Sequence, residues 1–241
     1  MIETSRSEPS SCEPIPVAAM VRHCCQLLGE RLPGQAPLAG LLVGCGSGNE
    51  VVHLRKAFRT RKVFGLDVET DFSTSAREEH CLVRADAQRL PFPSATFDFA
   101  AAFHSIEHVG DTGQALDEIC RVLRPGGWFY LGVPNKLRAV GYLGSVEATT
   151  WQKITWNLTD WRARLRGRFE NELGAHAGFA RAELSKLLTE RFATVQLLTE
   201  EFIRFKYAGR LPPALLNLLL APSVVNYTVP AHYALCQKAD A

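Results

Sequence analysis

The chain has 241 residues, of which 46% are apolar and 22% charged, and its 27 basic and 25 acidic residues leave a formal net charge of +2. This length suits one sizeable α/β core, and the near balance of charge gives no field that demands a polyanionic partner. The seven cysteines include no Cys-x-x-Cys pair, which favours reduced thiols over a disulfide framework or a zinc site. The N-terminus lacks a secretory apolar core and no apolar run matches a membrane span, so we expect a cytoplasmic protein.

Residues 1–14 are rich in Ser, Pro and Glu, which predicts a disordered tail before a single domain over 15–241. Apolar residues at helical spacing then predict a helix from about 17 to 28. Short apolar strands alternate with amphipathic helices beyond it. We predict strands at 40–43, 62–66, 81–84, 97–103, 128–133, 192–198 and 232–237, and helices at 49–58, 113–123 and 181–190. Repeated βα units predict an α/β fold with a parallel sheet and helices on both faces.

Two segments, at about 135–178 and 202–230, do not fit this alternation. Connections this long in a compact domain are usually functional. Ligands of open α/β sheets bind outside the carboxyl ends of the strands, where both segments leave the sheet. We therefore expect them to be cap insertions that form substrate walls.

Three glycines, Gly44, Gly46 and Gly48, join the apolar strand at 40–43 to the helix that begins at Asn49. Glycine allows a sharp turn and a close backbone approach to a ligand, and the following helix offers unpaired N–H groups. A dinucleotide site has the spacing GxGxxG, whereas these residues read GxGxG. The spacing favours S-adenosylmethionine over NAD.

Two carboxylates come at the ends of the next two strands. Asp67 closes the second strand, where it can accept hydrogen bonds from ribose hydroxyls, and Asp86 follows the third, where it can accept from an adenine amino group. Either one alone could be a solvated turn residue. Together with the glycine loop they predict a nucleoside-containing cofactor.

These motifs, VGCGSGNE, GLDVET, RADAQRLPFPSATFDFAAAFHSIEHV and RVLRPGGWFYLGVPN, resemble the successive motifs of class I S-adenosylmethionine-dependent methyltransferases over about residues 40–135. They resemble most the small-molecule branch with the LPFPSATFD and LRPGG signatures. The resemblance implies a Rossmann-like seven-stranded sheet, mostly parallel, with an antiparallel last strand. It also implies S-adenosylmethionine as cofactor, bound by residues at four places: Gly44, Cys45, Gly46, Gly48, Asp67, Val68, Asp86, Ala87, Phe103 and His104.

Candidates for a base that removes a proton from the acceptor follow the fourth strand, where the sequence reads Phe103-His104-Ser105-Ile106-Glu107-His108. An imidazole titrates near neutrality, so His108 on the substrate side and His104 on the cofactor side are the candidates, against a scaffold hydrogen bond as the plainer role. The same residues read HxxEH, the pattern of an inverted zinc peptidase. That pattern needs a helix, whereas here it follows a strand, so we predict no metal site.

The insertions give hints about the acceptor. Trp151, Trp156 and Trp161 stand among arginines, yet residues five apart advance about 140° around a helix and cannot form one stripe. This favours an aromatic cap over a small molecule and argues against a nucleic-acid groove. The leucine-rich run at 211–222 suits a buried short helix, with membrane-surface contact or an apolar acceptor as the alternative.

The sequence therefore predicts a monomeric or homodimeric methyltransferase acting on a small, partly apolar molecule. An RNA or protein methyltransferase is the first alternative. A non-catalytic S-adenosylmethionine-binding module is the alternative of another class.

Overall fold

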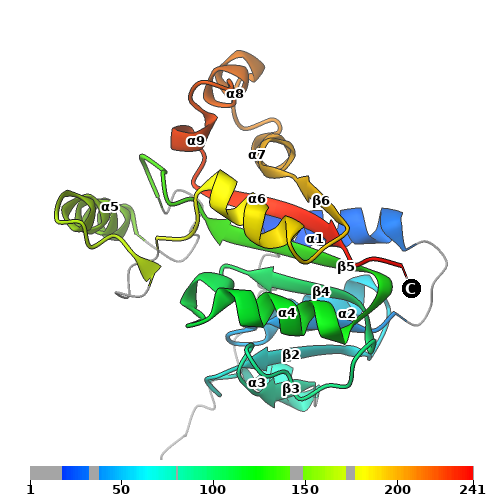
Figure 1. The fold of residues 1–241 in the computed structure, drawn as a ribbon. Coiled ribbons are helices and arrows are strands. Elements are labelled where there is room, and N and C mark those ends of the chain that lie inside the picture. Colours follow the sequence, from blue (N-terminus) through cyan, green and yellow to red (C-terminus); the bar gives the residue numbers. More distant parts are fainter. Residues whose placement is uncertain (1–17, 33–37, 80, 142–148, 172–176, 241) are drawn as a thin grey trace, which may run out of the picture.

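Seven strands form one sheet in the order β3-β2-β1-β4-β5-β7-β6 in the computed structural model, which describes residues 18–32, 38–79, 81–141, 149–171 and 177–240 (Figure 1). The strands are β1 (Gly40–Val43), β2 (Val63–Asp67), β3 (Leu82–Arg84), β4 (Phe97–Phe103), β5 (Leu123–Pro134), β6 (Thr194–Leu197) and β7 (Ala231–Gln237). The pairs among β1 to β5 are parallel, and β7 runs antiparallel to both of its neighbours, β5 and the edge strand β6. The predicted mostly parallel sheet with an antiparallel last strand is confirmed. The tail expected at 1–14 lies outside the described residues.

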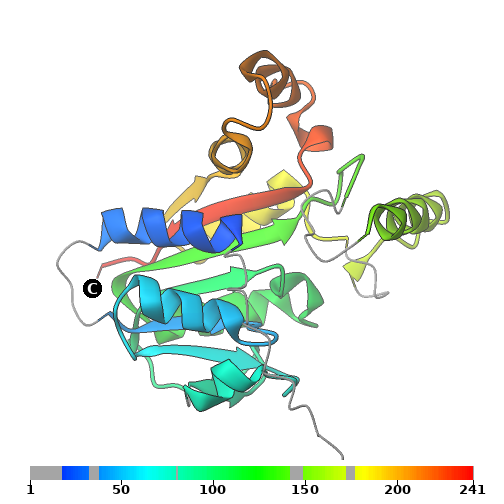
Figure 2. The ribbon, with the colours of Figure 1, turned by 180° about the vertical axis from the view of Figure 1, so that it is seen from behind.

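Helices cover both faces of the sheet. On one face lie α1 (Ala19–Arg31), α2 (Asn49–Ala57) and α7 (Thr199–Tyr207), and on the other lie α4 (Thr112–Val122) and α6 (Arg181–Thr189) (Figures 1 and 2). The short α3 (Thr74–Glu78), which the sequence did not predict, contacts α2. This doubly covered arrangement explains why the strands read as continuous apolar runs.

The central strands are buried along almost their whole length. All four residues of β1 are buried, and so is β4 from Phe97 to Ala102. A Cβ added at Gly40 would lie 2.2 Å from the ring of Phe99, so the glycine lets the two strands pack around that ring. The helices α3 and α4 begin at polar caps; Asp111 Oδ1, for example, accepts a hydrogen bond from the Gln114 amide at 2.9 Å ahead of α4.

The order in which strands are added to the sheet reverses between β1 and β4. The chain moves outward from β1 through β2 to β3, then returns to place β4 on the other side of β1. The loops after β1 and β4 therefore diverge and leave a crevice at the carboxyl ends of the strands. This topology fixes where a ligand can enter.

The two long segments that interrupt the alternation contain several helices, of which only the short one within the leucine-rich run at 211–222 was expected; of its residues only Leu216 is buried, so the expectation of a buried helix is wrong for most of it. The first contains α5 (Thr150–Leu165), and the second contains the end of α7, α8 (Pro213–Leu219) and α9 (Val225–Thr228). In both views α5 stands apart from the sheet and its covering helices (Figures 1 and 2). None of the helices in the described part of the chain is long and apolar enough to span a membrane.

Candidate active site

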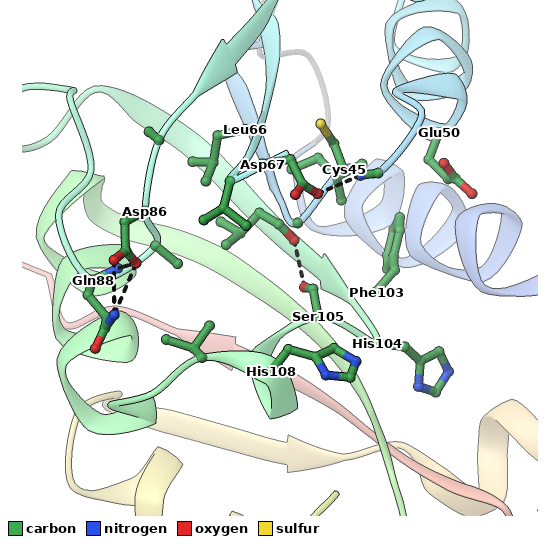
Figure 3. Close-up of a pocket in the computed structure, with 18 of the residues that line it drawn as sticks. Cys45, Glu50, Leu66, Asp67, Asp86, Gln88, Phe103, His104, Ser105 and His108 are labelled. Atoms are coloured by element: carbon green, nitrogen blue, oxygen red, sulfur yellow. Dashed lines mark hydrogen bonds between the residues drawn. The ribbon is translucent and has the colours of Figure 1, made fainter. Parts of the chain in front are cut away.

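A pocket of about 590 Å³ lies at the carboxyl ends of β1 to β4 (Figure 3). Its volume is in the range of small-molecule and cofactor sites. The lining includes His108 and every predicted cofactor-binding residue except Gly48. Residues that are far apart in the sequence therefore meet in one cavity, at the edge of the sheet where they were expected.

The glycine loop adopts a backbone that other residues rarely take. The φ angles of Gly44, Gly46 and Gly48 are +69°, +49° and +83°. A Cβ at Gly44 would lie 2.1 Å from that of Ser105, whereas a Cβ at Gly46 would meet no atom within 4 Å. Gly44 is thus required by packing, and Gly46 leaves its backbone open toward the pocket. Gly48 precedes α2 and packs near Ala76, which accounts for its absence from the lining.

The two carboxylates at the strand ends are held by local hydrogen bonds. Asp67 accepts from the Gly46 amide at 2.8 Å and from the Glu69 amide at 3.1 Å. Asp86 accepts from the backbone and side-chain nitrogens of Gln88 at 2.9–3.2 Å. A carboxylate oxygen has two lone pairs, so both groups can accept further hydrogen bonds from a ligand. The bond from Gly46 also ties the second strand to the glycine loop.

The end of β4 brings both histidines to the pocket. His104 has a φ of +52°, a strained value for a residue with a Cβ, and its amide donates to the Gly132 carbonyl at 2.8 Å. Ser105 Oγ donates to the Val43 carbonyl at 2.7 Å and so fastens this turn to β1. The side chains of His104 and His108 are 38% and 49% exposed. Both imidazoles can therefore meet a ligand.

Glu107 lies between the two histidines but is almost fully buried. Its Oε1 is 4.0 Å from His104 Nδ1 and 3.9 Å from His108 Nε2, and the side chain is 1% exposed. Neither oxygen has a hydrogen-bond partner of normal geometry among the described residues. Burial raises the pKa of Glu107 to about 7, although its own amide and the positive charge of Arg138 act in the opposite direction. Sequence patterns do not indicate this burial, since Glu107 stands in a polar turn.

The peptidase interpretation of HxxEH does not match the local backbone. His104 directly follows β4 in a left-handed conformation, and η1 (Ile106–His108) is a single 3₁₀ turn. The two imidazoles therefore do not share one face of an α-helix. In the described residues, no group of three or more His, Cys, Asp or Glu side chains is arranged to hold a metal ion.

Further residues line the pocket that sequence reasoning did not single out. Among them are Ser47, Glu50, Gln88, Ser105 and Val109. Glu50 lies in the first turn of α2, a position at which acids are common because they favour the helix dipole. Nothing in the sequence separates that ordinary role from contact with a ligand.

The pocket combines a glycine loop with carboxylates at successive strand ends, and it lies at the crevice that the strand order creates. This combination is typical of methyltransferase domains that bind a nucleoside-containing cofactor. Residues 41–131 match the family described as "Methyltransferase domain", as the predicted class I S-adenosylmethionine-dependent methyltransferase requires. The family resemblance predicted from the motifs is confirmed. Enzymes of this family take their methyl group from S-adenosylmethionine, as expected.

Similar proteins include a fatty-acid O-methyltransferase of Mycolicibacterium smegmatis, 38% identical over 37% of this chain and 34% of that protein. Another is the 27-O-demethylrifamycin SV methyltransferase of Amycolatopsis mediterranei, 30% identical over 48% of this chain and 47% of that protein. The chain thus aligns with only a third to a half of these relatives. A methyltransferase structure from Mesorhizobium loti shares the fold, with a TM-score of 0.56, 19% identity and coverage of 88% of this chain and 96% of that one.

The described residues fit the cofactor of this family. Gly46 offers open backbone beside the pocket, and a side chain there would occupy that space. The carboxylates of Asp67 and Asp86 line the same cavity as hydrogen-bond acceptors. α2 begins directly after the loop, so its N-terminal amides face the same region.

Proposed function

We propose that this chain transfers a methyl group from S-adenosylmethionine to a small, partly apolar acceptor. The observation that carries the proposal is the convergence of the glycine loop, Asp67, Asp86 and two histidines on one pocket. When bound, the cofactor supplies a methyl group on a positively charged sulfonium. Because in-line displacement needs neither a metal nor a covalent enzyme intermediate, the chain's main task is to hold the two reactants in line.

The cofactor-binding roles follow from the donors and acceptors present. The carboxylate of Asp67 accepts hydrogen bonds from ribose hydroxyls, and that of Asp86 accepts from the adenine amino group. The loop from Gly44 to Gly46 lets the backbone come close to the cofactor. Glu50 adds a negative charge to the lining, which suits the cofactor's ammonium group.

We assign proton removal to His108 and its positioning to Glu107. His108 accepts the proton from the acceptor's nucleophilic atom, and its ring becomes positively charged as it does so. The Glu107 carboxylate, 3.9 Å from His108 Nε2 and shielded from water, favours that imidazolium when it is ionised. Glu107 thus acts through the histidine and does not itself touch the acceptor.

The proposed acceptor class rests on the apolar character of the insertions and on the relatives. The insertions at 135–178 and 202–230 carry many apolar side chains and are the proposed acceptor walls, although none of their described residues lines the pocket itself. The two relatives are named for a fatty acid and a rifamycin, which are both small molecules with large apolar parts. These names support a small, partly apolar acceptor for this chain.

The proposal is tested by incubating the protein and methyl-labelled S-adenosylmethionine with an extract of its source. We expect label in a small, solvent-extractable product. Label in RNA or in protein would contradict the proposed acceptor class and favour the first alternative. Cofactor binding without transfer to any fraction would instead identify a non-catalytic binding module.

A further inference from the structure

One face of α5 carries an exposed apolar stripe. It consists of five side chains with exposed fractions of 75%, 46%, 60%, 46% and 84%: Trp151, Ile154, Leu158, Trp161 and Leu165. Their spacing alternates between three and four residues, so at 100° per residue they fall within an arc of about 80°. A helical stripe of this kind normally faces a protein core, but this one faces solvent. We call these five residues the α5 stripe.

Polar contacts on other sides of α5 hold the stripe in this outward orientation. Asp160, opposite the stripe, is buried and accepts a hydrogen bond from Arg138 at 2.7 Å. Asn157 exchanges two hydrogen bonds with the backbone of Gly141, at 2.7 and 3.1 Å. In both views α5 lies at the outer edge of the molecule (Figures 1 and 2). Turning the stripe inward would break the buried ion pair, which is costly.

The surroundings of the stripe are strongly basic. Residues 149–168 contain five Lys or Arg and one acid, the buried Asp160, and residues 204–230 contain three Lys or Arg and no acid. The rest of the chain is left with 19 basic and 24 acidic residues. The positive charge is therefore concentrated in these two stretches of the insertions, although the chain as a whole is almost neutral and the first insertion carries three further acids beside its stretch, Glu147, Glu170 and Glu172.

Some of the positive charges of the two insertions lie close enough to repel one another. Lys206 of α7 is partly buried, and the positive charges of Arg210 and of Lys153 on α5 act on it; burial and then these two charges lower its pKa. No described carboxylate forms an ion pair with Lys153, Lys206 or Arg210. An anionic partner would relieve the mutual repulsion of these groups.

We infer that α5 docks onto an anionic lipid surface, with the α5 stripe in the headgroup boundary and the basic side chains beside it on lipid phosphates. Interfacial helices combine Trp and Leu on one face with Lys and Arg around it. Arg162 lies roughly 60° around the helix from the middle of the stripe, close enough to reach outward from its flank.

Two other occupants fit the same face less well. Pairing of α5 with a second copy would bring two basic helices together with no exposed acid on either to offset the repulsion. A single-stranded nucleic acid would use the tryptophans for stacking, but the aliphatic Ile154, Leu158 and Leu165 have no ring to offer. An anionic membrane satisfies both the charge and the aliphatic area.

Flotation of the full chain with phosphatidylcholine vesicles, with and without phosphatidylglycerol, tests this inference. We expect association with the anionic vesicles that weakens as salt is added. The double variant Leu158→Ser/Leu165→Ser should lower association by roughly tenfold or more, because apolar contact is lost. Leu137→Ser, a matched change at an exposed leucine outside the stripe, should leave it unchanged. Arg162→Gln/Arg166→Gln should reduce the preference for anionic over neutral vesicles.

Several results would overturn the inference. These are no association with either vesicle, or equal association of the wild type and the leucine double variant. If the wild type formed a dimer without lipid and the double variant did not, the stripe would be a contact with a second copy of the chain. If the protein bound RNA but no vesicles, the stripe would be a nucleic-acid contact. Circular dichroism and S-adenosylmethionine binding verify that each variant is folded. Vesicle binding needs no turnover, so this inference can fail while the proposed methyl transfer holds.

Discussion

The carboxylate of Glu107 lies 3.9 Å from Nε2 of His108 and is almost fully shielded from water. The imidazole is about half exposed to the pocket, whereas the carboxylate beneath it is 1% exposed. A buried charge next to a group that becomes positive during catalysis can stabilise that positive form. The pair therefore links the protonation of Glu107 to the rate of the proposed reaction.

Replacing Glu107 by glutamine removes the charge but nearly keeps the shape. Above pH 7 the wild-type carboxyl is ionised, since its pKa is raised to about 7, and below that pH it becomes neutral like glutamine. We expect kcat of Glu107→Gln to fall about tenfold at pH 8 and much less at pH 6, with little change in cofactor KM. Steady-state kinetics at both pH values measure this. An equal loss at both would indicate a purely structural role.

The same substitution should change how stability depends on pH. The unfolded carboxyl releases its proton near 4.5, whereas the folded one keeps it to about 7, so the folded state binds more protons between these values. Wild-type stability therefore falls as pH rises through this window, by up to about 3 kcal/mol. Glu107→Gln should be less destabilised on going from pH 5 to pH 8, as measured by urea denaturation. Parallel pH profiles for the two proteins would contradict the assignment.

Substitutions of the two histidines should have different effects on turnover and on cofactor binding. His108→Ala is expected to lower kcat roughly 100-fold, while the dissociation constant of S-adenosylmethionine changes by about twofold or less. His104→Ala, at the end of β4, should mainly weaken cofactor binding. Turnover assays combined with calorimetry distinguish these outcomes. Unchanged turnover in His108→Ala would remove it as the base.

The two loop glycines offer a matched pair of substitutions. Alanine at Gly44 would place a Cβ 2.1 Å from that of Ser105, so Gly44→Ala should clearly lower the melting temperature. Alanine at Gly46 meets no atom within 4 Å and costs only the roughly 1–2 kcal/mol of a left-handed backbone. Gly46→Ala should thus remain folded and lose cofactor affinity. If it bound the cofactor like wild type, the loop would not contact the cofactor closely.

The parts that the sequence predicted depend on local patterns. The four-residue apolar run of β1, the glycines after it and Asp67 at the next strand end are visible because parallel strands end at one sheet edge. Alternating strands and helices predict the doubly covered sheet for the same reason. These inferences need the order of residues along the chain but no knowledge of long-range contacts.

The features that the sequence did not predict depend on contacts between segments that are distant along the chain. The burial of Glu107 arises from packing around η1, which a polar turn sequence does not indicate. The spacing of the three tryptophans rules out a stripe made of them alone, and Trp156 indeed lies off it. The α5 stripe becomes visible once Ile154, Leu158 and Leu165 are included, but its exposure follows from the buried pairing of Arg138 with Asp160. A helical apolar pattern alone would place it in a core.

Isothermal titration calorimetry with S-adenosylmethionine tests the central assignment most directly, comparing the wild type with Asp67→Ala and Asp67→Asn. The amide oxygen of the asparagine variant can still accept the hydrogen bond that Asp67 receives from the Gly46 amide at 2.8 Å, but the negative charge is lost. We predict clear binding by the wild type and a dissociation constant about thirtyfold higher in both variants, as expected for lost charge-assisted hydrogen bonds. No binding by the folded wild type, or undiminished binding by both variants, would contradict the account.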